Sequence, residues 1–158
     1  MVWLKNLTHR LHRLQQLGVK DGMLLIEAWV TLIWIDLVIL WRPYNKWRHW
    51  FVSKPKISMI DESQLLEVSH LIQVTEYAAR NHIRPMNCLR RTLAQQWILA
   101  RRKIICQVRI GVRMAEDRLE AHAWLTLRDK VLNDSADVSE YYTELKKDQW
   151  SEIGRFVD

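Results

Sequence analysis

The amino-acid sequence predicts an α+β protein, in which a helical N-terminal part is followed by one more helix and an antiparallel sheet. Apolar residues recur at helical spacing through the first 80 residues, and another strongly helix-forming run begins at Cys88. From about residue 104 the pattern changes to the two-residue alternation and β-branched content of strands. With 158 residues, of which 49% are apolar and 27% charged, the chain can bury a core of its own.

Positive charge is concentrated at one end of the chain. Residues 1–56 contain nine basic and three acidic residues, whereas residues 57–158 contain fifteen of each, so the first segment holds the whole net charge of +6. We therefore divide the chain into a basic helical segment, 1–56, which docks onto a partner or packs into the core, and a core domain, 57–158. A nucleic-acid-binding domain would more often carry such an excess in its main body, so nucleic acid is not an expected partner.

Cysteine usage indicates a reducing environment. Cys88 and Cys106 are too few for a disulfide framework, and Cys106 lies in an apolar alternating stretch that is typical of a core. The N-terminus lacks the short apolar core and small-residue cleavage site of a signal peptide. We expect a cytoplasmic protein, with peripheral membrane contact as an option and with neither a metal nor a cofactor bound to this chain.

The most apolar element is the predicted helix over residues 23–41, "MLLIEAWVTLIWIDLVILW". Three interpretations are open: a core helix whose acids pair with nearby bases, a peripheral helix that touches a membrane or a partner, and a membrane span. Glu27 and Asp36 are nine residues apart and therefore lie on opposite sides of a straight helix. A lone span would thus expose an acid to lipid, at a high cost in free energy.

Aromatic and basic side chains alternate in residues 41–51, directly after this helix. Such a segment suits a lipid headgroup layer, an acidic partner surface or a nucleic-acid stacking patch. A short amphipathic helix that buries Trp47, Trp50 and Phe51 gives the same pattern. This segment is the best docking candidate in the basic part of the chain.

Two more helices are predicted in the first 80 residues. Leucines at helical spacing predict a helix within residues 2–17. Pro55 lies in a stretch that is typical of a linker, and Asp61 with Gln64 resembles a capping box at the start of a helix that ends near Arg80.

The run "CLRRTLAQQWILARRK" predicts a helix that begins at Cys88, with Asn87 as its N-cap. A cysteine at the first helical position faces unpaired backbone N–H groups and the positive end of the helix dipole, which both favour the thiolate. Nine Lys or Arg and no acid lie between Glu76 and Glu116, which favours the thiolate further. Taken alone, however, a cysteine at a helix start is more often structural than catalytic.

Period-two patterns predict a strand over residues 104–112 and two more, "EAHAWLTL" and "VLND", on either side of a turn at "RDK". His122 and Asp134 then share one face if the hairpin is centred on Arg128 or on Asp129. A centre between these two residues would separate the imidazole from the carboxylate. The register of this hairpin therefore decides the site.

Cys88, His122 and Asp134 follow one another in the order and on the elements used by papain-like and transglutaminase-like cysteine enzymes. In such a triad the carboxylate fixes the imidazole tautomer, and the other ring nitrogen pairs with the thiol. The backbone N–H of Cys88 is the natural oxyanion donor, and Gln95 and Asn87 are candidate side-chain donors.

Three blocks, "NCLRRTLAQQWILARRK", "RIGVRM" and "EAHAWLTLRDKVLND", closely resemble the stand-alone transglutaminase-like leader peptidases of lasso-peptide biosynthesis. The resemblance is strongest over residues 87–134. It implies that Cys88 is the nucleophile, His122 the general base and then acid, and Asp134 the orienting group in the removal of a leader from a ribosomally made precursor. It also implies three partners: the precursor peptide, a separate leader-recognition protein and a macrolactam-forming cyclase.

Two alternatives remain open. The same triad can catalyse acyl transfer or deamidation, as transglutaminase-like folds do. In the other alternative, the chain is a non-enzymatic membrane or complex adaptor whose helices do the binding.

Overall fold

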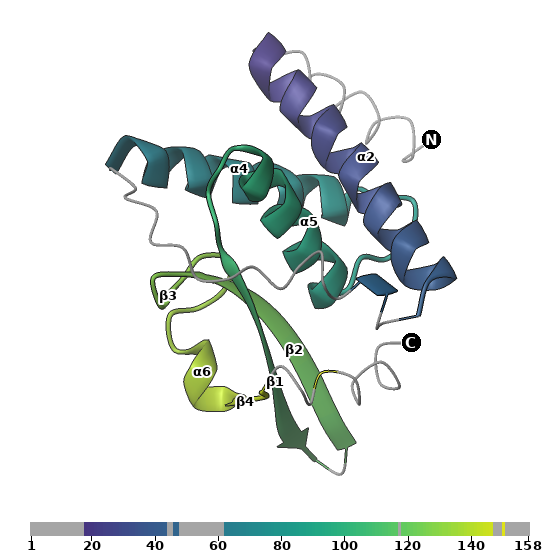
Figure 1. Cartoon of the computed structure of the whole chain (residues 1–158), viewed down its shortest axis with the longest axis vertical. Helices are drawn as coiled ribbons and strands as arrows, with labels where there is room; N and C mark the ends of the chain where they lie inside the picture. Colours follow the sequence, from purple (N-terminus) through teal and green to yellow (C-terminus); the bar gives the residue numbers. More distant parts are fainter. Residues whose placement is uncertain (1–17, 44–45, 48–61, 117, 147–149, 151–158) are drawn as a thin grey trace, which may run out of the picture.

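Three helices form one layer of the molecule, and an antiparallel sheet lies below them in the view of Figure 1. The computed structural model describes residues 18–43, 46–47, 62–116, 118–146 and 150. The three helices are α2 (Val19–Trp41), α4 (Glu62–Arg80) and α5 (Cys88–Arg101). The predicted α+β class is confirmed: a helical N-terminal part precedes a curled antiparallel sheet.

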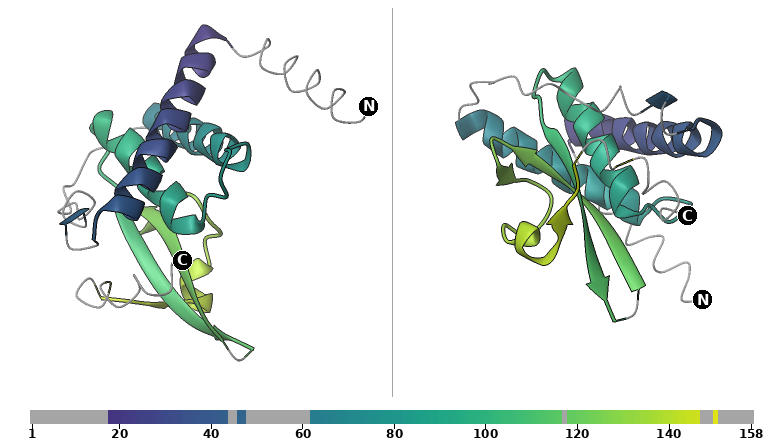
Figure 2. Two further views of the ribbon diagram at one scale, coloured as in Figure 1. Left: turned by 90° about the vertical axis from the view of Figure 1, so that its right-hand side faces the viewer. Right: turned by 60° about the horizontal axis from the view of Figure 1, so that its bottom comes forward.

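The sheet has four strands in the order β3-β2-β1-β4, and every pair is antiparallel. The strands are β1 (Gln107–Ala115), β2 (Arg118–Leu127), β3 (Lys130–Val131) and β4 (Thr143–Glu144), and the single-turn helix α6 (Val138–Tyr141) precedes β4. The far end of the β1–β2 hairpin extends beyond the helices in the views of Figures 1 and 2.

Strand β1 begins at Gln107, three residues later than the sequence pattern predicts. The reason is that α5 ends in a Schellman motif. The N–H of Ile104 donates to Leu99 O at 3.0 Å, and Lys103 occupies the left-handed region with φ 64°. These backbone groups close the helix, and extended pairing starts only after them.

Helix α5 is the central element of the fold because it contacts both other helices and strands β1 and β2. The face that it buries contains Leu93, Ala94, Ile98 and Leu99, which are at most 2% exposed. Cys106 is also buried in this core, as predicted from its alternating pattern. The core therefore lies on both sides of α5.

Helix α2 packs its inner face on α4 and α5 and pairs both of its central acids with arginines of α5. Glu27 binds Arg102 at 2.7 Å, at the end of α5, and the buried Asp36 binds Arg90 Nε at 2.7 Å, at its beginning. Asp36 also binds Arg84, in the loop before α5, at 3.0 Å. Although the two acids lie on opposite sides of α2, both find a partner at α5, because the long side chains of Arg90 and Arg102 reach them.

By length and composition alone, α2 could cross a membrane. An 18-residue window has a mean hydropathy of 2.2, and a third of that window is buried inside the protein. The same features occur in the core helix of a soluble protein and in a signal sequence. Its packing against α4 and α5 favours the core-helix interpretation, but only for the inner face of the helix.

The segment 41–51 is described only in part. Trp47 is buried, as the amphipathic-helix alternative requires, whereas Trp41, Arg42 and Lys46 are exposed. The predicted helix within 2–17, the linker around Pro55 and the capping residue Asp61 lie outside the described residues.

Asp36→Ala is expected to lower the free energy of unfolding by about 3 kcal/mol, because it leaves the mostly buried Arg90 guanidinium without its carboxylate. Urea denaturation measures this change. In the matched control Asp21→Ala, the half-exposed His70 loses its carboxylate partner, and the expected loss of unfolding free energy is below about 1 kcal/mol. Equal costs for the two variants would show that the Asp36 pair does not hold α2 on α5.

Candidate active site

Cys88 is the first residue of α5, where the predicted N-cap geometry is confirmed. The Asn87 side chain accepts a hydrogen bond from Arg90 N at 3.0 Å, and the backbone of Asn87 is extended. No acidic residue lies in the first turn of the helix. The thiol therefore lies at the positive end of a helix dipole.

His122 lies on β2, directly opposite Gly111 of β1. Its ring stacks on Tyr142 with a centroid distance of 5.0 Å, and Trp124, on the same face, lies 6.2 Å away. The absent side chain of Gly111 makes this packing possible. A Cβ there would lie 2.8 Å from both Trp124 and Tyr142, closer than side-chain carbons approach.

Asp134 reaches His122 by a route that the sequence pattern did not predict. β2 and β3 pair Thr126 with Val131, so the hairpin centre lies between Arg128 and Asp129, and neither predicted centre is correct. Both turn residues have positive φ, 50° and 62°, as in the tight two-residue turns that match the twist of a hairpin.

This register does not separate the imidazole from the carboxylate, because β3 ends at Val131. After the hydrogen bond from Leu132 N to Leu125 O, the chain leaves the ladder, and Asp134 lies in the loop that follows. Its carboxylate then bonds His122 Nε2 at 2.5 Å.

Asn133 gives the chain this change of direction, and sequence reasoning missed its role. Its side-chain oxygen accepts a hydrogen bond from Leu125 N at 2.7 Å, where a continuing strand would offer a backbone carbonyl. Its amide nitrogen donates to Gln95 Oε1 at 2.7 Å and to Thr92 Oγ1 at 3.2 Å. Thr92 Oγ1 in turn donates to Ala123 O, so α5 is bonded to β2 beside His122. In the sequence, the one sign of this role is that Asn133 directly precedes Asp134.

A chain of polar contacts continues from there into α4. Gln95 Nε2 donates to Glu76 Oε1 at 2.9 Å, and Glu76 Oε2 accepts from Arg91 Nη1 at 2.9 Å. The Gln95 side chain is 1% exposed and its amide bonds groups inside the fold, so it is not placed to donate to an oxyanion at a solvent-accessible site. Asn87 accepts the capping hydrogen bond with its side-chain oxygen, so its amide nitrogen stays a candidate donor beside the backbone N–H groups of the first turn, which suit an oxyanion.

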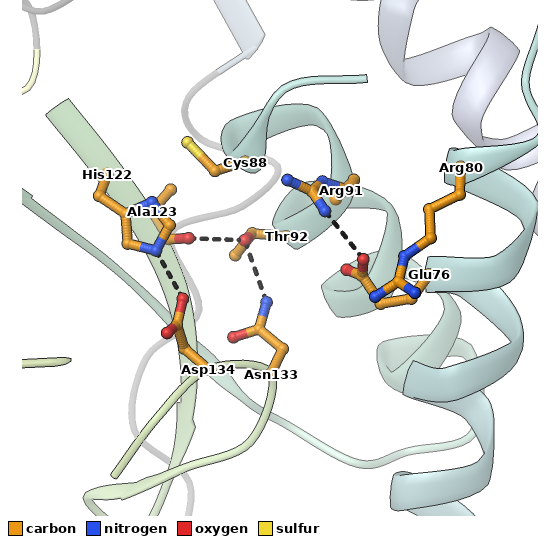
Figure 3. A pocket seen from close by; sticks show the side chains of 9 residues that line it. All are labelled: Glu76, Arg80, Cys88, Arg91, Thr92, His122, Ala123, Asn133 and Asp134. Carbon is orange, nitrogen blue, oxygen red and sulfur yellow. Dashed lines mark hydrogen bonds and ion pairs between the residues drawn. The ribbon is translucent and has the colours of Figure 1, made fainter. Parts of the chain in front are cut away.

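An open pocket is lined by residues of α4, α5, β2 and the loop after β3. Figure 3 shows Cys88, His122 and Asp134 on one side of it, with Glu76, Arg80 and Arg91 on the other. The full lining is Glu76, Arg80, Cys88, Arg91, Thr92, His122, Ala123, Asn133 and Asp134. All three predicted triad residues thus meet at one solvent-accessible site.

The electrostatics of the site favour a thiolate and an imidazolium. Burial raises the pKa of the Cys88 thiol. The imidazole of His122 and hydrogen bonds with the backbone of Ala123 and Leu89 lower it by more, so the pKa lies below its ordinary value. The hydrogen bond with Cys88 raises the pKa of His122, against its partial burial, and the Asp134 contact raises it further. Since Asp134 binds Nε2, the nitrogen that can bond the thiol is Nδ1.

Cys106 provides the internal comparison for this thiol. Burial raises its pKa to about 12, and it stays a thiol. In the described part of the chain, no three His, Cys, Asp or Glu side chains come together as a metal site. The thiol, imidazole and carboxylate around Cys88 can perform nucleophilic attack on a carbonyl carbon.

Comparison with known proteins places this geometry in context. A family model described as the transglutaminase-like superfamily matches residues 31–147, about three quarters of the chain. Members of that superfamily are typically cysteine peptidases or acyltransferases. Searches of curated proteins and of solved structures returned no significant match.

At neutral pH, Cys88 is expected to alkylate with iodoacetamide much faster than Cys106, because only the thiolate reacts. The pH midpoint of the Cys88 rate should lie below 9.0, the ordinary thiol value, since its pKa is lowered. His122→Ala removes the hydrogen bond and should move the midpoint upward. Mass spectrometry of the labelled peptides gives both rates, and a midpoint that does not respond to His122→Ala would contradict the ion pair.

Asn133→Ala is expected to lower the free energy of unfolding by about 1–3 kcal/mol, because Leu125 N and Gln95 Oε1 lose their partner. The variant should also raise the pH midpoint of Cys88 alkylation, since Asp134 is no longer directed at His122. Asn81→Ala, which removes one exposed hydrogen bond to Tyr77, is the matched control and should leave that midpoint unchanged. Thermal unfolding and labelling together distinguish a positioning role of Asn133 from a purely structural one.

Proposed function

We propose that this chain, which belongs to the transglutaminase-like superfamily, is a cysteine peptidase that removes the leader from a lasso-peptide precursor. The observation that supports peptidase chemistry is an open pocket lined by Cys88, His122 and Asp134, in which the Asp134 carboxylate bonds the imidazole and the imidazole lowers the pKa of the thiol. The lasso-specific part rests on the three sequence blocks that resemble leader peptidases of that pathway.

In the proposed reaction, the Cys88 thiolate attacks the carbonyl carbon of the last leader residue. The backbone N–H groups at the start of α5 stabilise the oxyanion. The His122 imidazolium gives its proton to the leaving amine, so the core peptide departs with a free N-terminus and the leader stays bound as a thioester. His122 then takes a proton from water, and the hydroxide attacks the thioester and displaces the Cys88 thiolate. The leader leaves as a carboxylate, its acid proton goes to solvent, and the thiolate and imidazolium are restored.

Asp134 keeps its role through both steps. It holds the imidazole with Nδ1 towards the thiol and stabilises its positive charge. Because an orienting group contributes less than the nucleophile, we expect Asp134→Ala to retain partial activity, whereas His122→Ala should lose nearly all of it.

The proposal includes three partners in the cytoplasm. The precursor peptide is the substrate, a separate protein recognises its leader, and a macrolactam-forming cyclase uses the freed amine of the core. No metal or nucleotide is assigned to this chain, since the steps above use only protein groups and water.

Cleavage is tested with the purified full chain, a precursor peptide and a leader-recognition protein taken from genes that neighbour its own. Mass spectrometry should show loss of the leader with wild type and none with Cys88→Ala. Cys106→Ala removes the other thiol and is the matched control, which should still cleave because Cys106 lies outside the pocket.

The same spectra separate the alternatives. A deamidated glutamine or a crosslinked product that depends on Cys88, without leader loss, would replace the peptidase by a deamidase or an acyltransferase. Undiminished cleavage by Cys88→Ala would overturn the triad assignment. Retained complex assembly by that variant, with no Cys88-dependent product from wild type, would favour the adaptor.

A further inference from the structure

The outward face of α2 is apolar along its whole length, which is unusual for a helix that faces solvent. Between Asp21 and Leu40, every exposed residue of the helix is apolar. We call these side chains, with the one apolar residue at either end, the outer stripe: Val19, Met23, Ile26, Val30, Ile33, Leu37, Leu40 and Trp41. Several are more than half exposed, including Met23 at 67% and Val30 at 59%.

The outer stripe is a continuous line. Its members up to Leu40 follow one another at alternating steps of four and three residues, so they lie in one row for about 30 Å. The helix forms one edge of the helical layer in Figures 1 and 2, and no described element covers the row. A contiguous exposed apolar surface of this kind marks an interaction site.

In the described part of residues 1–56, the exposed charged side chains are all basic. All three acids of residues 1–56 are turned towards the body of the protein, where Asp21 pairs with His70, Glu27 with Arg102 and Asp36 with Arg90.

The exposed bases lie at the two ends of the row. Lys20 is exposed at its start, and Arg42 and Lys46 are exposed at its end, next to Trp41, which is 80% exposed. A row of aliphatic side chains between bases, with an indole at one end, matches the boundary between acyl chains and anionic headgroups.

We propose that the outer stripe docks α2 lengthwise on the surface of a membrane that contains anionic phospholipids. The helix lies flat and does not span the bilayer, because its inner face is packed on α4 and α5 and because Glu27 and Asp36 are both paired with arginines of α5. A bilayer is a better occupant than a protein partner because interfaces between proteins include about one hydrogen bond per 100–200 Å², and the row between Asp21 and Leu40 offers no exposed polar side chain for one.

Flotation of the full chain with phospholipid vesicles tests the proposal. The wild type should float with vesicles of phosphatidylcholine and phosphatidylglycerol, float less with phosphatidylcholine alone, and lose binding as salt is raised. The triple variant Ile26→Gln, Val30→Gln, Ile33→Gln should bind about tenfold more weakly or worse, because it removes the apolar contact while the bases remain.

The matched control removes three exposed apolar side chains elsewhere, Leu66→Gln, Met114→Gln and Leu119→Gln, and should float like the wild type. Iodoacetamide labelling of Cys88 at the wild-type rate shows that each variant is folded. If the stripe triple fails this check, the single variant Val30→Gln takes its place, with a smaller expected loss of binding.

A wild type that stays out of the anionic vesicle fraction would overturn the proposal, as would a folded stripe variant that binds like the wild type. Concentration-dependent dimers that the stripe variant abolishes, without vesicle binding, would assign the outer stripe to a second copy of the chain. Capture of the wild type by an acidic protein from the same gene neighbourhood, again without vesicle binding, would assign it to a protein partner.

Discussion

The hydrogen bonds of Asn133 are the interaction on which the candidate active site depends. Its oxygen replaces a strand residue as the partner of Leu125 N, and its nitrogen binds Thr92 and Gln95 on α5. One side chain thus ends the β3 ladder, joins the central helix to the sheet and sets the direction of the next residue, Asp134. A buried polar network of this kind holds a single geometry only when each member is satisfied.

Helix α2 connects the nucleophile to the exterior of the protein. On its inner face, Asp36 binds Arg90, two residues beyond Cys88, and Arg84 in the loop before it. The start of α5 is therefore fixed from both directions along the chain. On its outer face the same helix is apolar. The family match begins at residue 31 and includes this part of α2.

Sequence patterns predicted the local features of the site. Asn87 caps α5 and Cys88 begins it because the capping preference acts over three residues, and the structure has that hydrogen bond. The alternation that brings His122 and Trp124 to one face of a strand is equally local. The burial of Cys106 also follows from a short pattern, and its high pKa follows from that burial.

The sequence by itself determined the α+β class, the thiol at a helix start, and the order of Cys88, His122 and Asp134 along the chain. Only the tertiary structure decided how these groups meet. The hairpin register was wrongly predicted because turn residues allow several centres, and the end of β3 depends on Asn133, whose partners lie on another helix. Likewise, charge counts located the basic segment, but packing decided that its three acids pair with the body of the protein and that Lys20, Arg42 and Lys46 are exposed. Pairings between residues far apart in sequence leave no periodic signal, because they arise from the packing of whole elements.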